Sequence, residues 1–168
     1  MRFAAPAAAL AVALAITASV GRSEDHVIDP RAAALVAEGR AALSAGTPDK
    51  AVDAFEAALA VDPAANGILL DLAEAARQEG LQGKAIHYYR EALERDPANL
   101  DALSGEGAAL VEKGAVEKAQ RNLAKLQSMC GADCPEAKAL AAAIAQGPQA
   151  RVLTAEAVMP DAVVTQQN

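Results

Sequence analysis

The stretch KAVDAFEAALAVDP, residues 50–63, recurs 34 residues later as KAIHYYREALERDP, residues 84–97. Both copies carry apolar residues at intervals of three and four, which is typical of an amphipathic helix, and both end in Asp-Pro. Similar helical patterns run from Ala32 to about Met129, separated by glycines and prolines, and no stretch alternates apolar and polar residues as a strand would. The chain is therefore predicted to be all-α, with helices of about three to four turns.

A 34-residue period of helix, short turn and helix resembles the tetratricopeptide repeat (TPR) family from Ala32 to about Gly131. The register places three repeats at residues 32–65, 66–99 and 100–131. The small residues that the family has at its eighth and twentieth positions are present in each repeat: Gly39, Ala73 and Gly107, and Ala51, Ala85 and Ala119. The large apolar residue of its twenty-fourth position is Phe55, Tyr89 and Leu123.

The third repeat departs from the family pattern near its end. Leu126 stands where the first two repeats have the small residues Ala58 and Ala92, and Gly131 replaces the closing proline. The early Trp and the Tyr of the family's first helix are absent from all three repeats. After this point, residues 135–146 predict one more helix, which we interpret as a cap on the last repeat.

The resemblance implies a right-handed α-solenoid of about three TPR helix hairpins plus a C-terminal capping helix. One hairpin alone leaves an apolar face in water, and stacked copies cover one another's faces. The predicted organisation of the chain is a signal peptide, a flexible lead-in, a TPR domain and an irregular tail, at residues 1–21, 22–31, 32–146 and 147–168.

The first 21 residues have the pattern of a secretory signal peptide. Arg2 precedes a nearly continuous apolar run that ends at Val20, and the small residues Ser19 and Gly21 flank its end. We expect cleavage near Gly21 and a periplasmic or secreted protein. Because the apolar run is long, an uncleaved membrane anchor is the alternative. No later run is long enough to cross a bilayer, so no membrane insertion is expected after cleavage.

The acidic composition argues against nucleic-acid binding. The chain has 15 Lys and Arg against 22 Asp and Glu, a net charge of −7. Loss of residues 1–21 removes one Arg and no acid, which brings the net charge to −8. Such a chain repels phosphate backbones, and the three aromatic residues that remain after this loss, Phe55, Tyr88 and Tyr89, are too few to form a platform on which bases stack.

The two cysteines, Cys130 and Cys134, lie in the sequence MCGADCP. In an exported protein this spacing favours a disulfide that closes a small ring at the turn before the capping helix. A redox-active pair is the alternative, although the spacing is not Cys-x-x-Cys and no basic residue adjoins it. A zinc site is disfavoured because His26 and His87 are both far away in the sequence.

No set of residues in the sequence predicts catalysis. A Gly-x-Ser-x-Gly context is absent, and SGEGAAL at residues 104–110 lacks the Lys-Ser/Thr pair and the preceding strand of a phosphate-binding loop. The protein is therefore predicted not to be an enzyme and to use no cofactor or metal.

In this family the first helices of the repeats line a concave face that holds ligands, and the resemblance implies such a groove here. Residues at matching positions are Val36, Arg40, Leu70, Glu74, Arg77, Gln78, Asp101, Ser104 and Glu112. Members that clamp the carboxylates of chaperone tails have Lys and Asn where this chain has Val36 and Arg40, so that ligand is not supported. Arg40 and Arg77 are predicted to face the ligand together and to clamp a segment that bears carboxylates. The chain's own tail, with Glu156 and Asp161, is a competing occupant.

Together these patterns predict a non-enzymatic exported TPR scaffold that binds a protein or peptide partner. Assembly of an envelope or secretion complex is the expected setting, as for other small exported bacterial proteins of this family. Two alternatives remain. One is a thiol redox protein that uses Cys130 and Cys134, and the other is a structural subunit that self-associates weakly through its open repeat face.

Overall fold

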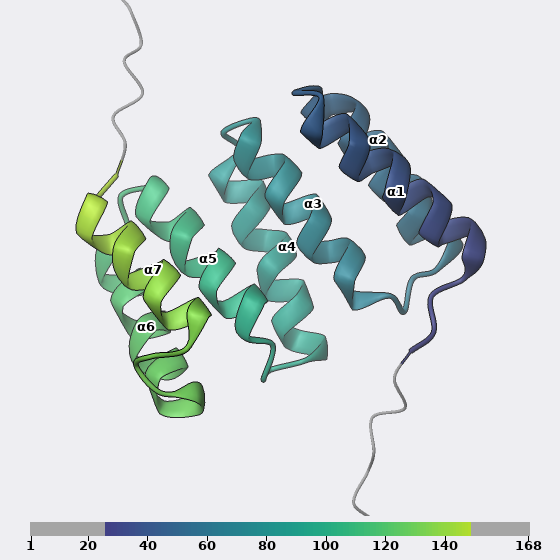
Figure 1. Ribbon diagram of the computed structural model, residues 1–168. Helices are drawn as coiled ribbons and strands as arrows, with labels where there is room; N and C mark the ends of the chain where they lie inside the picture. The colour runs from purple at the N-terminus through teal and green to yellow at the C-terminus, as the bar shows by residue number, and fades with distance from the viewer. Residues whose placement is uncertain (1–25, 149–168) are drawn as a thin grey trace, which may run out of the picture.

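The computed structural model describes residues 26–148, which form seven helices stacked as hairpins (Figure 1). The helices are α1 (Pro30–Ser44), α2 (Pro48–Val61), α3 (Asn66–Gln78), α4 (Gln82–Arg95), α5 (Leu100–Glu112), α6 (Val116–Cys130) and α7 (Pro135–Gln146). The prediction of an all-α stack of three hairpins with a capping helix is confirmed. Among these seven helices, none combines the length and the apolar character that a membrane span requires.

The hairpins pack in chain order. Helices α1 and α2, α3 and α4, and α5 and α6 pair with each other, and α2 contacts α3 as α4 contacts α5. The last helix, α7, packs on both α5 and α6 and so covers the end of the stack. Figure 1 shows α1 and α2 at one end of the molecule and α6 and α7 at the other.

Each hairpin turns at a glycine in the left-handed region of backbone space. Gly46, Gly80 and Gly114 follow the first helix of their hairpins, with φ angles of 71°, 76° and 83°. Residues with a Cβ adopt this conformation at a cost, which explains why glycine recurs there. The 34-residue period of the sequence is thus the period of the turns.

The N-terminal part of the domain starts earlier than the sequence indicated. Helix α1 begins at Pro30 rather than near Ala32, because the Asp29 side chain caps it by accepting a hydrogen bond of 2.7 Å from the Arg31 N–H. Residues 26–29 belong to the segment interpreted as a flexible lead-in. They instead contact the first hairpin, where Ile28 packs against the core. The interpretation of a lead-in is therefore wrong for residues 26–31.

The small residues of the repeat pattern lie where helices approach closely. Ala51, Ala85 and Ala119 are completely buried. At Gly39 a Cβ atom would lie 2.4 Å from the Phe55 ring, so only glycine leaves room for that ring between α1 and α2. The packing register inferred from the sequence therefore holds in the first hairpin.

The small residue of the third repeat has a different neighbour. A Cβ on Gly107 would lie 2.5 Å from the Leu140 side chain, which belongs to α7 rather than to the partner helix α6. Leu140 is itself fully buried. Gly39 therefore lets α2 pack closely on α1, whereas the equivalent Gly107 lets the capping helix α7 pack closely on α5.

One buried carboxylate ties three helices together. Glu106 on α5 is 7% exposed and accepts hydrogen bonds from Arg90 on α4, at 2.7 Å, and from Asn122 on α6, at 2.9 Å. A buried charge is stable in a fold when it is paired and hydrogen-bonded in this way. From the sequence, only Gly107 in this segment was assigned a packing role, and the role of Glu106 was not predicted.

Candidate functional site

The first helices of the hairpins form one continuous face of the molecule. Helix α1 contacts α3, and α3 contacts α5, although each pair is separated in the chain by a second helix. Helix α7 extends the row because it packs on α5. Two pockets lie along this face, and four of the nine predicted groove residues line them: Val36, Arg40, Arg77 and Glu112.

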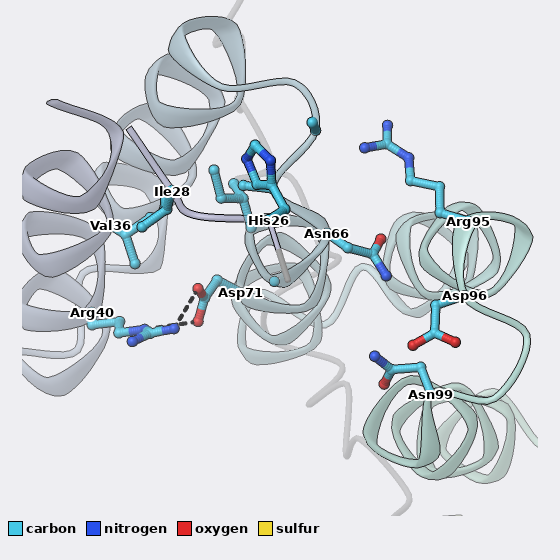
Figure 2. A pocket seen from close by; sticks show the side chains of 13 residues that line it. His26, Ile28, Val36, Arg40, Asn66, Asp71, Arg95, Asp96 and Asn99 are labelled. Atoms are coloured by element: carbon cyan, nitrogen blue, oxygen red, sulfur yellow. Dashed lines mark hydrogen bonds and ion pairs between the residues drawn. The ribbon is translucent and has the colours of Figure 1, made fainter. Parts of the chain in front are cut away.

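The larger pocket, of about 600 Å³, lies at the end of the face near the starts of α3 and α5. Figure 2 shows its walls: the N-terminal segment with His26, helix α1 with Val36 and Arg40, helix α3 with Asp71, and the turn between α4 and α5. Arg95 at the end of α4 contributes to this wall, and the turn adds Asp96 and Asn99. The pocket therefore joins the N-terminal segment to parts of the first and second repeats.

Arg40 in this pocket is already paired within the protein. Its Nε and a terminal nitrogen donate to the two carboxylate oxygens of Asp71 at 3.0 Å and 2.9 Å, and Figure 2 marks both contacts. This bidentate geometry is the strongest form of an arginine–carboxylate contact. The hydrogen bonds that Arg40 donates to Asp71 raise the pKa of Arg40 above its ordinary value.

The smaller pocket, of about 490 Å³, lies at the other end of the face. Arg77 and Glu112 line it together with Ala108, Val111 and residues of the last turn of α7. Arg77 donates to Glu112 and, at 2.9 Å, to Glu74. Burial alone would lower the pKa of Arg77, but the hydrogen bond to Glu112 and the charges of both carboxylates outweigh it and raise that pKa.

These contacts change the interpretation of the two arginines. The sequence suggested that Arg40 and Arg77 are free to clamp a carboxylate of the ligand. Each instead holds a carboxylate of the next repeat, Asp71 and Glu112 respectively. A ligand carboxylate would have to compete with a formed ion pair at both places, so the structure does not support the clamp as it was predicted.

The remaining predicted groove residues differ in their surroundings. Glu74 is held by Arg77 and by a hydrogen bond of 3.4 Å from Gln78, and Asp101 is exposed. Leu70 is half-buried against the core. Ser104 donates a hydrogen bond of 3.1 Å to the carbonyl of Glu136, so it attaches the capping helix to α5 rather than facing a ligand. Of the predicted groove residues, those on α1 and α3 together with Asp101 and Glu112 on α5 therefore remain candidates for ligand contact.

The N-terminal segment is a part of the site that sequence reasoning missed. The His26 ring lies 2.8 Å from both carboxylate oxygens of Asp62, and the Asp29 N–H donates to the same carboxylate at 2.9 Å. Asp62 is 6% exposed, and the Asp29 N–H together with His26 holds the pKa of this carboxyl below its ordinary value. These contacts fix His26 and Ile28 as a wall of the larger pocket.

The start of α3 also contributes a residue that was not predicted from the sequence. Asn66, the first residue of α3, donates to the carbonyl of Ala92 at 3.1 Å and lines the larger pocket, while its side-chain oxygen is buried without a partner among the described residues. Asn99, the N-cap of α5, lines the same pocket. The groove positions implied by the family do not include these residues at the boundaries between repeats.

Cys130 and Cys134 are joined by a disulfide with an S–S distance of 2.03 Å. The bond links the end of α6 to the start of α7. Glu136 lies close to both sulfurs, and these three residues are a group with potential metal-ligand atoms in residues 26–148. Since both sulfurs are in the disulfide, they are not available as thiolate ligands in this state.

Comparisons with known proteins agree with this architecture. A model of the tetratricopeptide repeat family matches residues 36–99 and, in a second copy, residues 83–120. No curated protein matches the chain. The TPR domain of Sgt2 from Aspergillus fumigatus has 26% identity and a TM-score of 0.63, over 70% of this chain and 80% of that one.

Two further solved structures have the same fold. The first TPR domain of Spaghetti (RPAP3), bound to the HSP90 peptide SRMEEVD, has a TM-score of 0.63 at 21% identity, over 73% of this chain and 96% of that one. The type III secretion translocator chaperone SycD of Yersinia enterocolitica has a TM-score of 0.61 at 22% identity, over 70% of this chain and 89% of that one. At these identities the likeness is one of fold.

Proposed function

Because the chain belongs to the tetratricopeptide repeat family, we propose that it is a non-enzymatic, exported scaffold that binds a protein or peptide partner in an envelope or secretion complex. The observation that carries the proposal is the pair of pockets, of about 600 and 490 Å³, along one row of first helices. An extended segment that crosses this row contacts every repeat. Recognition of this kind needs no reacting group.

Peptide binding by proteins of the same fold supports the proposal. The first TPR domain of Spaghetti (RPAP3) is bound to an HSP90 peptide, and the second TPR domain of human RPAP3 is in complex with an HSP70 peptide. This chain lacks the Lys and Asn that chaperone-tail binders of the family carry, and has Val36 and Arg40 there. Its partner is therefore expected to differ from chaperone tails in chemistry.

The charges of the groove favour a ligand without excess negative charge. Arg40 and Arg77 are neutralised by Asp71 and Glu112, and Glu74 and Asp101 add further negative charge to the same face. A protein of net charge −7 repels acidic segments as a whole. We therefore expect a polar or basic segment in the groove, in place of the acidic motif inferred from the sequence.

A groove ligand and its variants test the proposal directly. Peptides selected from a random display library on the chain from Arg22 onward are expected to bind at least about tenfold more weakly when Glu74→Lys and Asp101→Lys are combined. Fluorescence anisotropy of a labelled selected peptide measures the Kd. The matched control combines Glu94→Lys and Glu117→Lys, which make the same change in net charge on the second helices α4 and α6.

The outcomes separate groove binding from general electrostatics. Loss of affinity in the groove variant alone supports the proposal. An equal loss in both variants would mean that overall charge, and not the groove, attracts the peptide. Failure to select any peptide that competes with an unlabelled copy of itself would remove peptide binding from the account.

The export part of the proposal rests on residues 1–21, which lie outside the described residues. Arg2, the apolar run and the small residues at its end are what support it. In a bacterial host that exports proteins, the mature chain is expected to begin near Arg22 and to appear in the periplasm or the medium. Intact mass spectrometry checks this, and a membrane-bound chain that retains Met1 would replace export with anchoring.

A further inference from the structure

The outer side of α2 is acidic. Asp49, Asp53 and Glu56 follow one another at spacings of four and three, so they lie on one side of the helix, and all three are exposed. We call them the acidic face. Glu79, at the end of the next hairpin's first helix, lies beside it, and burial together with the Asp49 carboxyl raises the pKa of Glu79. Lys84 on α4 lies 3.7 Å from Glu56 and offsets part of this charge. Asp49, Asp53 and Glu79 have no ion pair among the described residues, so carboxyl groups still predominate at this end of the molecule.

The outer side of α6 has the opposite charge. Lys118, Arg121 and Lys125 follow one another at spacings of three and four and are all exposed. We call them the basic face. Within the part of the chain that the structure describes, none of the three has a carboxylate within ion-pair distance. Lys113 adds further positive charge around a recess of about 230 Å³ beside Lys118, while Arg90 in the same recess is already paired with Glu106.

Helix stability does not explain the placement of Lys118. Lys118 is the third residue of α6. The positive end of the helix dipole lies at this terminus, so a cation there is unfavourable. The basic face is also unusual in a chain in which acids outnumber bases by 22 to 15. An external anionic surface would account for both features.

The two faces match in length but cannot meet within one molecule. In each set the first and last charges are seven residues apart, which corresponds to about 10 Å along a helix. The acidic face lies on the first hairpin and the basic face on the third, at opposite ends of the stack (Figure 1). Every copy of the chain carries both an acidic and a basic face. A second copy is therefore a binding partner that fits either face.

We propose that the basic face of one copy binds the acidic face of a second copy. The two surfaces are different, so the contact is heterologous and leaves one free face of each kind at the ends of the assembly. Copies therefore add end to end while their concave grooves remain open. Because exposed ion pairs are individually weak and the net charge of −7 opposes contact, the association is weak and depends on ionic strength.

Sedimentation velocity over a range of protein concentrations tests the proposal on the chain from Arg22 onward. The association constant is expected to fall at least about tenfold when salt is raised from about 10 mM to about 300 mM, because screening shortens the reach of the ion pairs. Association that strengthens with salt would show that repulsion between like-charged molecules dominates, and would overturn the proposal. A chain that stays monomeric at every salt and protein concentration would overturn it as well.

Charge reversal identifies the faces. The basic-face variant combines Lys118→Glu, Arg121→Glu and Lys125→Glu, and the acidic-face variant combines Asp49→Lys, Asp53→Lys and Glu56→Lys. Each alone is expected to lose association by at least about tenfold, and an equimolar mixture of the two is expected to regain it, because the reversed faces are again complementary. Circular dichroism checks that both variants keep their helices. If one of them loses helical structure, Gln substitutions at the same positions replace the charge reversals.

The mixture is the decisive arm of the experiment. If reversal of the basic face weakens association and reversal of the acidic face does not, the anionic contact lies elsewhere and the proposal is wrong. If both variants lose association but the mixture does not regain it, the two faces do not contact each other. Neither result affects peptide binding in the concave groove, which is measured separately with a labelled peptide.

Discussion

Replacement of Phe55 with alanine is expected to lower the free energy of unfolding by about 3–5 kcal/mol. The Phe55 ring is completely buried and lies directly over Gly39, between the two helices of the first hairpin. Its removal takes away apolar contacts and leaves a cavity that rigid helices fill poorly. Urea unfolding followed by circular dichroism measures the change. A loss of this size is a large part of the stability of an ordinary domain.

Leu81→Ala is the matched control for Phe55→Ala. Leu81 is 46% exposed, and its truncation is expected to change the free energy of unfolding by less than about 1 kcal/mol. If Phe55→Ala leaves too little folded protein to measure, Phe55→Leu supplies a smaller cavity at the same place. A change at Phe55 no larger than the change at Leu81 would contradict the packing described for the first hairpin.

The same substitution at two glycines is expected to have opposite effects. Gly39→Ala places a methyl group 2.4 Å from the Phe55 ring, and we expect a loss of about 1–3 kcal/mol from the resulting overpacking. Gly67→Ala, in the first turn of α3, meets no atom within 4 Å. It is expected to stabilise the protein by up to about 1 kcal/mol, because alanine restricts the unfolded chain.

This pair of variants separates packing from helix propensity. Alanine favours a helix over glycine at both positions, so propensity alone predicts stabilisation twice. Thermal or urea unfolding of the two variants side by side measures the difference. If Gly39→Ala is as stable as Gly67→Ala, the helices of the first hairpin have room to separate, and the repeat register assigned from the sequence fails at its most specific position.

Much of the fold was accessible from the sequence because its determinants repeat. The turn glycines, the buried alanines at positions such as Ala51 and Ala85, and the Asp-Pro pairs recur with one period, so each copy supports the interpretation of the other. The end of the stack could be predicted for the opposite reason, namely a break in the repeat. Leu126 and Gly131 break the pattern where the neighbour changes from another repeat to a capping helix.

The ion pairs of the groove were harder to predict, although three of the four residues that form them were predicted to lie in the groove. Arg40 pairs with Asp71 and Arg77 with Glu112, at separations of 31 and 35 residues, which is close to one repeat. Facing positions of adjacent first helices therefore hold opposite charges. The repeat pattern relates each arginine to its equivalent position in the other repeats, whereas its ion-pair partner lies on the adjacent first helix. Comparing Arg40 and Arg77 with the acidic residues about one repeat later predicts both ion pairs.

The N-terminal wall of the larger pocket depends on contacts that no local pattern reveals. His26 lies in a short charged segment without helical period, and its partner Asp62 is 36 residues away, in the Asp-Pro turn at the end of the first repeat. In the sequence, Asp62 has the same context as Asp96, which is exposed. Only the fold distinguishes them, because the first repeat has no preceding repeat and the N-terminal segment covers that turn instead.

The central claim is that a peptide lies across the first helices of the repeats, and amide chemical-shift mapping tests it most directly. The measurement uses 15N-labelled chain from Arg22 onward, titrated with a peptide selected from the display library. The account predicts that the largest shifts fall in the groove, at residues such as Leu70, Glu74 and Asp101, and that the outer sides of α2, α4 and α6 change little. Large shifts on those outer sides, with the groove unchanged, would contradict it.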